Sequence, residues 1–245
     1  MKRVFFLFYA FICYLIFLGT CLYAIGFVGN LVVPKTIDGA NTISITGAIF
    51  IDALLLLVFA LQHSIMARPF FKRWWIRFIP EPLERSTYVL LASLCLLLVM
   101  WQWQPIGGIV WSVDNVFIKT VLLCTYACGW TLVVLSTFLI NHFDMFGLRQ
   151  TWLYFNHKQY HPLPFRTPFF YRFVRHPLYL GFIVAFWATP VMTAAHLLFA
   201  ILTTAYILTA IVFEEKDLVS HFGESYVSYK RKSSSIIPFL KQYKP

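Results

Sequence analysis

A short motif near the C-terminal end of the chain combines residue types that bind a carboxylate. Arg175 and His176 stand directly before Pro177, and proline is favoured in the first turn of a helix, where its missing N–H costs nothing. The start of a helix offers unpaired backbone N–H groups and the positive end of the helix dipole, so an anionic group is stabilised there. Gly181, one turn further along, permits close approach of a ligand or of a neighbouring helix. The motif therefore predicts a carboxylate site.

A pair of acidic residues further along the chain has the opposite chemistry. Glu214 and Glu215 offer negative charge to an ammonium or a sulfonium group. If the chain brings this pair beside the basic motif, the two ends together suit a zwitterion with an additional positive centre. S-adenosylmethionine has that charge pattern. The alternative is an arginine that reaches the membrane edge and pairs with a glutamate without binding a ligand.

The two motifs flank residues 177–213, an apolar stretch that must fold back on itself. The chain is 60% hydrophobic and only 12% charged, whereas a soluble domain has about 25% charged residues, so the surrounding solvent is lipid. As one straight helix the stretch would be about 55 Å long, against a bilayer core of about 30 Å. Pro190 and the candidate N-cap Thr193 mark the turn between arms at 177–191 and 194–213. This hairpin places both charged motifs on one face of the membrane.

Four further apolar stretches are long enough to span a bilayer, since a span needs about 20 apolar residues. They lie at about 4–29, 43–66, 87–104 and 116–140. Eighteen of the twenty Lys and Arg residues fall on one side if the N-terminus is cytoplasmic, as the positive-inside rule requires. The sequence therefore predicts an all-α, polytopic transmembrane helical bundle with a C-terminal helical hairpin, as one domain over residues 1–245. Both termini are predicted in the cytoplasm, and residues 214–245 are predicted to form a C-terminal cytoplasmic tail.

Candidate proton acceptors lie at the predicted cytoplasmic ends of two helices. The fourth helix ends in Asn141, His142 and Asp144. Because imidazole has the side-chain pKa nearest neutral pH, His142 is predicted to be a base or proton relay that Asp144 orients, or else a residue that stabilises the helix C-terminus. The second helix ends in Gln62 and His63, and ionisable groups at membrane depth are functional candidates. We predict His63 as a further catalytic residue, and Asn141 and Gln62 as substrate-binding residues.

Three other side chains each have a functional and a structural interpretation. Arg149 contacts substrate or cofactor, or it pairs with Asp144, or it only sets the topology. Tyr179 on the hairpin faces the cofactor, or it is a packing tyrosine. Tyr171 lies in an aromatic, proline-rich loop; it covers an adenine ring or belongs to an interfacial aromatic belt.

The predicted tail carries an aromatic stripe. Phe222, Tyr226 and Tyr229 are spaced i, i+4, i+7 and share one helix face. Such a stripe either folds back over the site as a lid or rests on lipid headgroups. Asp52, toward the outer half of the second helix, is interpreted as an interhelical hydrogen-bonding residue.

The sequence contains no residue pattern typical of a metal site or of nucleic-acid binding. The five cysteines lie inside apolar runs without a CxxC pair, and the remaining histidines lack metal-ligand spacing. The net charge of +10 is spread over loops, where topology and anionic headgroups explain it. We predict the lipid bilayer as the surroundings, and no metal, nucleic-acid or protein partner.

A wider resemblance rests on two C-terminal elements. RHPLYLG at 175–181, the hairpin, and EEKDL..HFGESYVSYK at 214–230 resemble the cofactor motif of the isoprenylcysteine carboxyl methyltransferase and phospholipid methyltransferase superfamily. Those proteins are membrane methyltransferases that use S-adenosylmethionine. The resemblance implies the same cofactor here, bound by these elements.

Other segments are similar to one branch of that superfamily, the bacterial methanethiol S-methyltransferases. The similar segments are QHSIMARPFFKRWW at 62–75, PEPLERSTYVL at 80–90 and NHFDMFGLRQTWLY at 141–154. This implies methyl transfer to a small thiol, methanethiol, with dimethyl sulfide as product, in a bacterial inner membrane. Because the thiolate is the nucleophile, such an enzyme must remove a proton and align two sulfurs.

Two other functions stay open at the level of sequence. One is a methyltransferase with the same cofactor that acts on a prenylcysteine carboxylate or an amine headgroup. A carboxylate acceptor needs no base, so loss of His142 would then be tolerated. A non-enzymatic transporter or scaffold is the other alternative. Transporters tend to have paired broken helices in two related halves, whereas this chain has one hairpin and no internal repeat.

Overall fold

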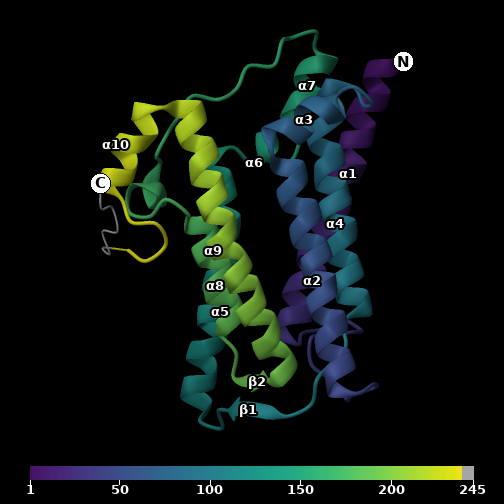
Figure 1. Ribbon diagram of the computed structural model, residues 1–245, viewed down its shortest axis with the longest axis vertical. Helices are drawn as coiled ribbons and strands as arrows, with labels where there is room; N and C mark the ends of the chain where they lie inside the picture. The colour runs from purple at the N-terminus through teal and green to yellow at the C-terminus, as the bar shows by residue number, and fades with distance from the viewer. Residues whose placement is uncertain (239–245) are drawn as a thin grey trace. The chain divides into compact units, whose positions relative to one another are not determined.

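The structure, a computed structural model, describes residues 1–238 as helices and two short strands (Figure 1). The elements are α1 (Lys2–Gly29), α2 (Ile45–Ala67), α3 (Pro69–Trp75), η1 (Glu81–Leu83), α4 (Glu84–Gln102), β1 (Ile109–Ser112), α5 (Val116–Ile140), α6 (His142–Met145), α7 (Leu148–Phe155), η2 (Phe169–Arg172), α8 (Pro177–Trp187), β2 (Val191–Thr193), α9 (Ala194–Phe222) and α10 (Glu224–Lys232). Five helical segments among these residues are long and apolar enough to cross a bilayer. The predicted all-α polytopic membrane fold is confirmed.

The chain folds into two compact units. Unit 1 comprises Met1–Gly108, Asn141–Pro162 and Thr193–His196; unit 2 comprises Ile109–Ile140, Leu163–Met192 and Leu197–Pro245. The single domain over residues 1–245 stays a prediction.

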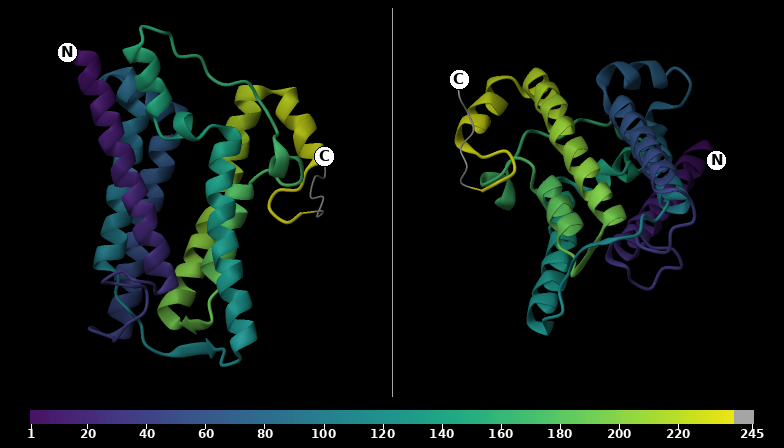
Figure 2. Two further views of the ribbon diagram at one scale, coloured as in Figure 1. Left: turned by 180° about the vertical axis from the view of Figure 1, so that it is seen from behind. Right: turned by 60° about the horizontal axis from the view of Figure 1, so that its bottom comes forward.

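In unit 1, α4 packs against both α1 and α2, and the three helices run side by side (Figure 2). The guanidinium of Arg3 lies 5.1 Å from the ring centre of Tyr154 in α7. Nearby, the hydroxyls of Tyr9 and Thr87 are 3.1 Å apart, which joins the start of α1 to the start of α4. The N-terminus, the start of α4 and the α6–α7 segment therefore share one end of this unit, as the charge pattern predicted.

Two hydrogen bonds join separate segments of the chain at the opposite end of unit 1. The indole N–H of Trp103 donates to the Ile37 carbonyl at 3.1 Å, and the backbone N–H of Gln104 donates to Asp52 Oδ1 at 2.8 Å. Asp52 is fully buried, and its Oδ1 accepts this hydrogen bond from the segment that follows α4, which partly offsets the cost of its burial. Its predicted role between helices is confirmed.

In unit 2, α5 crosses α8 where two glycines meet. A Cβ added to Gly181 would lie 2.7 Å from the Gly129 carbonyl oxygen, and one added to Gly129 would lie 2.8 Å from the Gly181 carbonyl oxygen. Small residues allow membrane helices to approach closely, which increases van der Waals packing. Of the two roles predicted for Gly181, the structure shows the approach of a neighbouring helix.

The hairpin turn lies where the sequence placed it. Thr193 Oγ1 accepts from the backbone N–H of His196 at 3.1 Å, which confirms the predicted N-cap of α9. The first arm, however, ends at Trp187 rather than residue 191. The next residues form the strand β2, which pairs with β1, an element that the apolar pattern does not distinguish from helix.

The second arm of the hairpin, helix α9, extends beyond the apolar run that predicted it. The apolar run stops at Phe213, whereas α9 continues to Phe222, so the two glutamates lie within the helix and not at its end. Residues 214–221 are mostly compatible with a helix although they are polar, and hydropathy does not detect such a continuation. Gly223, with φ of 57°, then separates α9 from α10.

The glycine crossing gives a test of this packing. We expect Gly181→Ala to lower the free energy of unfolding by about 2 kcal/mol, because the added methyl group meets a backbone carbonyl that cannot move away. Thermal denaturation in detergent measures this. Gly19→Ala in α1 is the matched control, since nothing lies within 4 Å of its added Cβ. Alanine has the better helix propensity, so the control should be neutral or stabilising; equal behaviour of both variants would contradict the close crossing.

Candidate functional site

The structure brings the two charged motifs of the hairpin together in unit 2. Arg175 Nε lies 2.6 Å from Glu215 Oε1, and His176 Nε2 lies 3.2 Å from the same oxygen. The Tyr179 hydroxyl donates to Glu214 Oε2 at 2.8 Å. Residues some forty positions apart therefore form one cluster of charged and polar groups.

The members of this cluster differ in their access to solvent. The side chains of Arg175 and Glu215 are only 7% and 11% exposed, and His176 is buried. A buried ion pair is tolerated when its geometry is good and its remaining hydrogen-bonding groups are satisfied. The side chain of Glu214 is 39% exposed, so it is the carboxylate that a polar ligand can reach directly.

The segment after α10 binds the start of α8. The backbone N–H of Arg175 donates to the Ser234 carbonyl at 2.9 Å, and that of His176 donates to the Ser235 carbonyl at 3.1 Å. Arg175 Nη1 also donates to the Ser233 carbonyl. The expectation that Arg175 and His176 have free backbone donors is therefore wrong, because a parallel bridge between Val174 and the tail takes up these groups.

The same part of the chain supplies a lysine that was not predicted. Lys230 Nζ lies 2.8 Å from Glu215 Oε2. Lys230 was one of many basic residues in a tail that the charge pattern assigned only to topology. Its place beside Glu215 depends on the turn at Gly223, which spacing alone does not reveal.

The aromatic stripe of the tail folds back onto the loop before η2. The ring of Phe165 lies 5.1 Å from Phe222, 5.8 Å from Tyr226 and 5.4 Å from Tyr229, measured between ring centres. The three residues do not share one continuous helix, since α9 ends at the first of them. Tyr226 is 2% exposed, and within residues 1–238 its hydroxyl has no hydrogen-bond partner. An orphaned buried hydroxyl of this kind suits a polar ligand.

The remaining residues predicted to bind a cofactor make packing contacts. Pro177 occupies the first turn of α8, as predicted, and is buried. The Tyr171 hydroxyl donates to the Ser136 carbonyl of α5 at 3.3 Å, and burial raises the pKa of this phenol. With two carboxylates, three basic side chains and one unpaired hydroxyl among the described residues, the cluster has groups of both charges that suit a small zwitterion, and its exposed carboxylate suits a further positive charge.

The predicted proton acceptor lies in unit 1, in a mostly aromatic environment. His142 is 9% exposed, and its Nε2 lies 2.8 Å from the Tyr14 hydroxyl. Burial lowers the pKa of His142, because the charged imidazolium loses hydration. Asn141 Oδ1 accepts from the backbone N–H of Asp144 at 2.9 Å, so Asn141 is the N-cap of the short helix α6.

Asp144 binds the segment that follows it. Arg149 Nη1 lies 2.7 Å from Asp144 Oδ1, and the Tyr160 hydroxyl donates to Oδ2 at 3.4 Å. Gln150 Nε2 donates to the Asp144 carbonyl at 3.0 Å. Arg149 therefore makes the acidic pair that was one of its predicted roles. The hydroxyl of Tyr14, which was not predicted, makes the bond to the His142 ring.

The second predicted histidine borders the same aromatic cluster. The Tyr88 hydroxyl lies 3.1 Å from the ring nitrogens of His63. Tyr88 packs with Phe146, whose ring centre is 4.8 Å from that of His142. Gln62 donates to the Met66 sulfur at 3.1 Å, and among the residues that the structure describes its Oε1 is buried without a partner. His142 and His63 thus contact aromatic side chains of unit 1, and Gln62 contacts Met66, whereas Asp144 pairs with Arg149.

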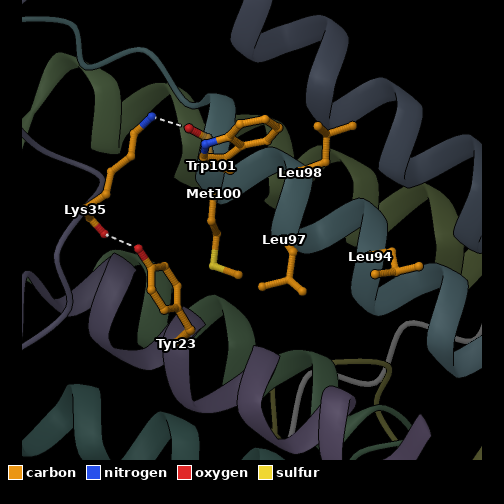
Figure 3. A pocket seen from close by; sticks show the side chains of 7 residues that line it. All are labelled: Tyr23, Lys35, Leu94, Leu97, Leu98, Met100 and Trp101. Atoms are coloured by element: carbon orange, nitrogen blue, oxygen red, sulfur yellow. Dashed lines mark hydrogen bonds between the residues drawn. The ribbon is translucent and has the colours of Figure 1, made fainter.

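A separate apolar pocket of about 390 Å³ in unit 1 shares no residue with these groups (Figure 3). It is lined by Tyr23, Lys35, Leu94, Leu97, Leu98, Met100 and Trp101. Lys35 Nζ donates to the Trp101 carbonyl, and the Tyr23 hydroxyl donates to the Lys35 carbonyl at 3.2 Å. The polar groups of this pocket therefore bond mainly to one another.

Comparison with known proteins first gives the class. Residues 124–225 match the phospholipid methyltransferase family, and this range contains α8, Arg175 and both glutamates. This family match, together with the long apolar helices, defines the class as a membrane methyltransferase. The methanethiol S-methyltransferase of Crocosphaera subtropica is 55% identical over 240 residues, covering 98% of this chain and 94% of that protein. The chain belongs to the methanethiol S-methyltransferase family.

Other relatives agree with this assignment. The methanethiol S-methyltransferase of Mycobacterium tuberculosis is 51% identical over 239 residues, covering 98% of each chain. A Nurim homolog of Drosophila pseudoobscura pseudoobscura is 30% identical over 180 residues, covering 70% of each chain. No solved structure matches this chain.

The buried ion pair predicts a large effect of losing one partner. We expect Glu215→Ala to lower the free energy of unfolding by about 3 kcal/mol, because Arg175 is left buried without its counter-charge. Thermal denaturation in detergent measures the change. Glu224→Ala is the control: its side chain is 76% exposed and 3.9 Å from Arg231, so its loss should change little. Equal effects of the two variants would show that the buried pair does not stabilise the hairpin.

Proposed function

We propose that this protein transfers the methyl group of S-adenosylmethionine to methanethiol, giving dimethyl sulfide and S-adenosylhomocysteine. The observation that carries the proposal is the cluster of Arg175, His176, Glu214 and Glu215, formed by the two ends of the hairpin. Relatives at about half identity over nearly the whole chain are named for this reaction, which supports the acceptor.

The side chains of the cluster fit S-adenosylmethionine by charge. The exposed Glu214 carboxylate suits its ammonium or sulfonium group, and the basic side of the cluster, with Arg175 and His176, suits its carboxylate. The unpaired hydroxyl of Tyr226 is a further polar contact. When bound, the cofactor supplies an electrophilic methyl group on a positively charged sulfur. The protein residues bind and orient it, and the surrounding aromatic side chains exclude water.

We assign removal of the thiol proton to His142. Burial lowers its pKa, so at neutral pH the imidazole is uncharged and able to accept a proton. Tyr14 positions the ring through the bond to Nε2, and Asp144 stays a proposed support for this segment through Arg149. His63, Gln62 and Asn141 are proposed to line the acceptor side, where apolar aromatic surroundings suit a small thiol.

The charge pattern supports a location in a bacterial inner membrane with both termini in the cytoplasm. At one end of unit 1 lie the N-terminus, the loop after α2 and the segment that contains Arg149. Positive charge concentrated at one end of a membrane helix bundle favours the cytoplasmic side.

The direct test uses purified full-length protein in detergent. We expect saturable binding of S-adenosylmethionine and release of dimethyl sulfide, measured in the headspace, when methanethiol is supplied. Glu214→Ala should weaken cofactor binding by about tenfold, because it removes the accessible carboxylate. Lack of saturable binding by the wild-type protein would rule out the proposed function.

Loss of the proposed base should affect chemistry and not cofactor binding. We expect His142→Gln to lower kcat with methanethiol by about 100-fold, since positioned proton transfer contributes roughly this much, and to leave the Kd of S-adenosylmethionine unchanged. Single-turnover methyl transfer and equilibrium binding measure the two quantities. Asn156→Ala, an exposed position in the same loop region, serves as control. Full activity of His142→Gln would favour an acceptor that needs no base.

The lowered pKa of His142 also predicts the pH dependence. Because burial lowers the pKa of His142 from its ordinary value of 6.5, the imidazole becomes half-protonated at a pH below that value. We expect kcat/KM for the thiol to fall on the acid side with a midpoint below pH 6.5. A midpoint above that value would contradict the assignment, since a raised pKa requires a compensating negative charge.

A further inference from the structure

A positively charged side chain of the tail, that of Lys230, pairs with Glu215. Lys230 Nζ lies 2.8 Å from Glu215 Oε2, whereas Arg175 Nε and His176 Nε2 both approach Oε1. Lys230 belongs to α10, which Gly223 separates from α9 (Figure 1). The two oxygens of one carboxylate are therefore shared between the hairpin and the tail.

Lys230 is held less firmly than Arg175. The arginine side chain is 7% exposed, its Nη1 donates to the carbonyls of Lys230 and Ser233, and its backbone N–H donates to Ser234. The lysine side chain is 23% exposed and ends in a compact ammonium on a flexible stem. Lys230 can therefore turn away from Glu215 without breaking the buried pair between Arg175 and Glu215.

The net charge of the cluster depends on the position of this lysine. With Lys230 in place, the charges of Arg175 and Lys230 balance those of Glu214 and Glu215 among these four side chains. When Lys230 turns away, one negative charge is left. S-adenosylmethionine has one net positive charge, and S-adenosylhomocysteine, from which the methyl group has gone, has none. A negative site therefore favours the donor over the product more than a neutral site does.

We propose that Lys230 is an exchangeable counter-ion that sets the selectivity of this site between the cationic methyl donor and its neutral product. The proposal rests on the proposed function. The ammonium leaves Glu215 when the positively charged ligand binds, and it returns when the ligand has lost that charge. Its return restores neutrality and favours release of the product. Lys230 is a positioning residue, since it acts through Glu215.

Equilibrium binding of both ligands to the purified full-length protein in detergent tests this. We expect Lys230→Met to raise the ratio of the Kd of S-adenosylhomocysteine to that of S-adenosylmethionine by about tenfold, equivalent to about 1.4 kcal/mol. Lys230→Arg keeps the charge and should keep the wild-type ratio. Lys232→Met removes the same charge from an exposed position of the same helix, and it should also keep the wild-type ratio.

The outcomes distinguish a role of Lys230 in ligand selectivity from a role in holding Glu215 in place. If Lys230→Met changes both dissociation constants by the same factor, Lys230 only supports Glu215 and the proposal is overturned. If that variant does not fold, Lys230→Gln, which keeps a hydrogen-bond donor without the charge, carries the same expectation. A wild-type protein that binds neither ligand contradicts the proposed function itself, whereas binding with an unchanged ratio contradicts only the role of Lys230.

Discussion

An arginine and a glutamate that are both buried at the end of membrane helices must lie together, because neither charge is stable out of water alone. Arg175 and Glu215 meet this requirement at 2.6 Å, and one of them stands before α8 while the other lies in α9. Both ends of the hairpin are therefore held at the same level. The remaining hydrogen-bonding groups of the pair are satisfied by His176, Lys230 and backbone carbonyls of the tail. Without these partners the burial of two charges would be a net cost.

The hydrogen bonds that stabilise this ion pair also determine which polar groups of the site remain available to a ligand. A helix start is usually a place where backbone N–H groups bind an anion. Here the N–H groups of Arg175 and His176 bond to the tail, and the Arg175 side chain is largely committed to Glu215. The accessible polar group is instead the Glu214 carboxylate, whereas the hydroxyl of Tyr226 is buried and, within the described residues, unpaired. The most exposed charged side chain of this cluster is thus an acid, whereas the sequence motif by itself drew attention to the basic residues.

The aromatic cluster of unit 1 has different requirements. An apolar acceptor such as a small thiol needs few polar contacts, so shape and exclusion of water matter more than hydrogen bonds. His142 is held by the Tyr14 hydroxyl and lies against the ring of Phe146. An imidazole in these surroundings stays uncharged, which is the state in which it accepts a proton. The same burial that accompanies the packing therefore also keeps this imidazole in the state that the proposed role as a base requires.

Local patterns determined the membrane helices, both charged motifs and the N-cap at Thr193, because hydropathy, helix propensity and capping depend on neighbouring residues. The same patterns missed the continuation of α9 to Phe222, since a polar helix has no apolar signal. Only the tertiary structure decided that Lys230 reaches Glu215, that the tail takes up the N–H of Arg175, and that Tyr14 binds His142. These pairings join residues far apart in the chain, and they depend on turns and helix crossings whose geometry no single segment contains.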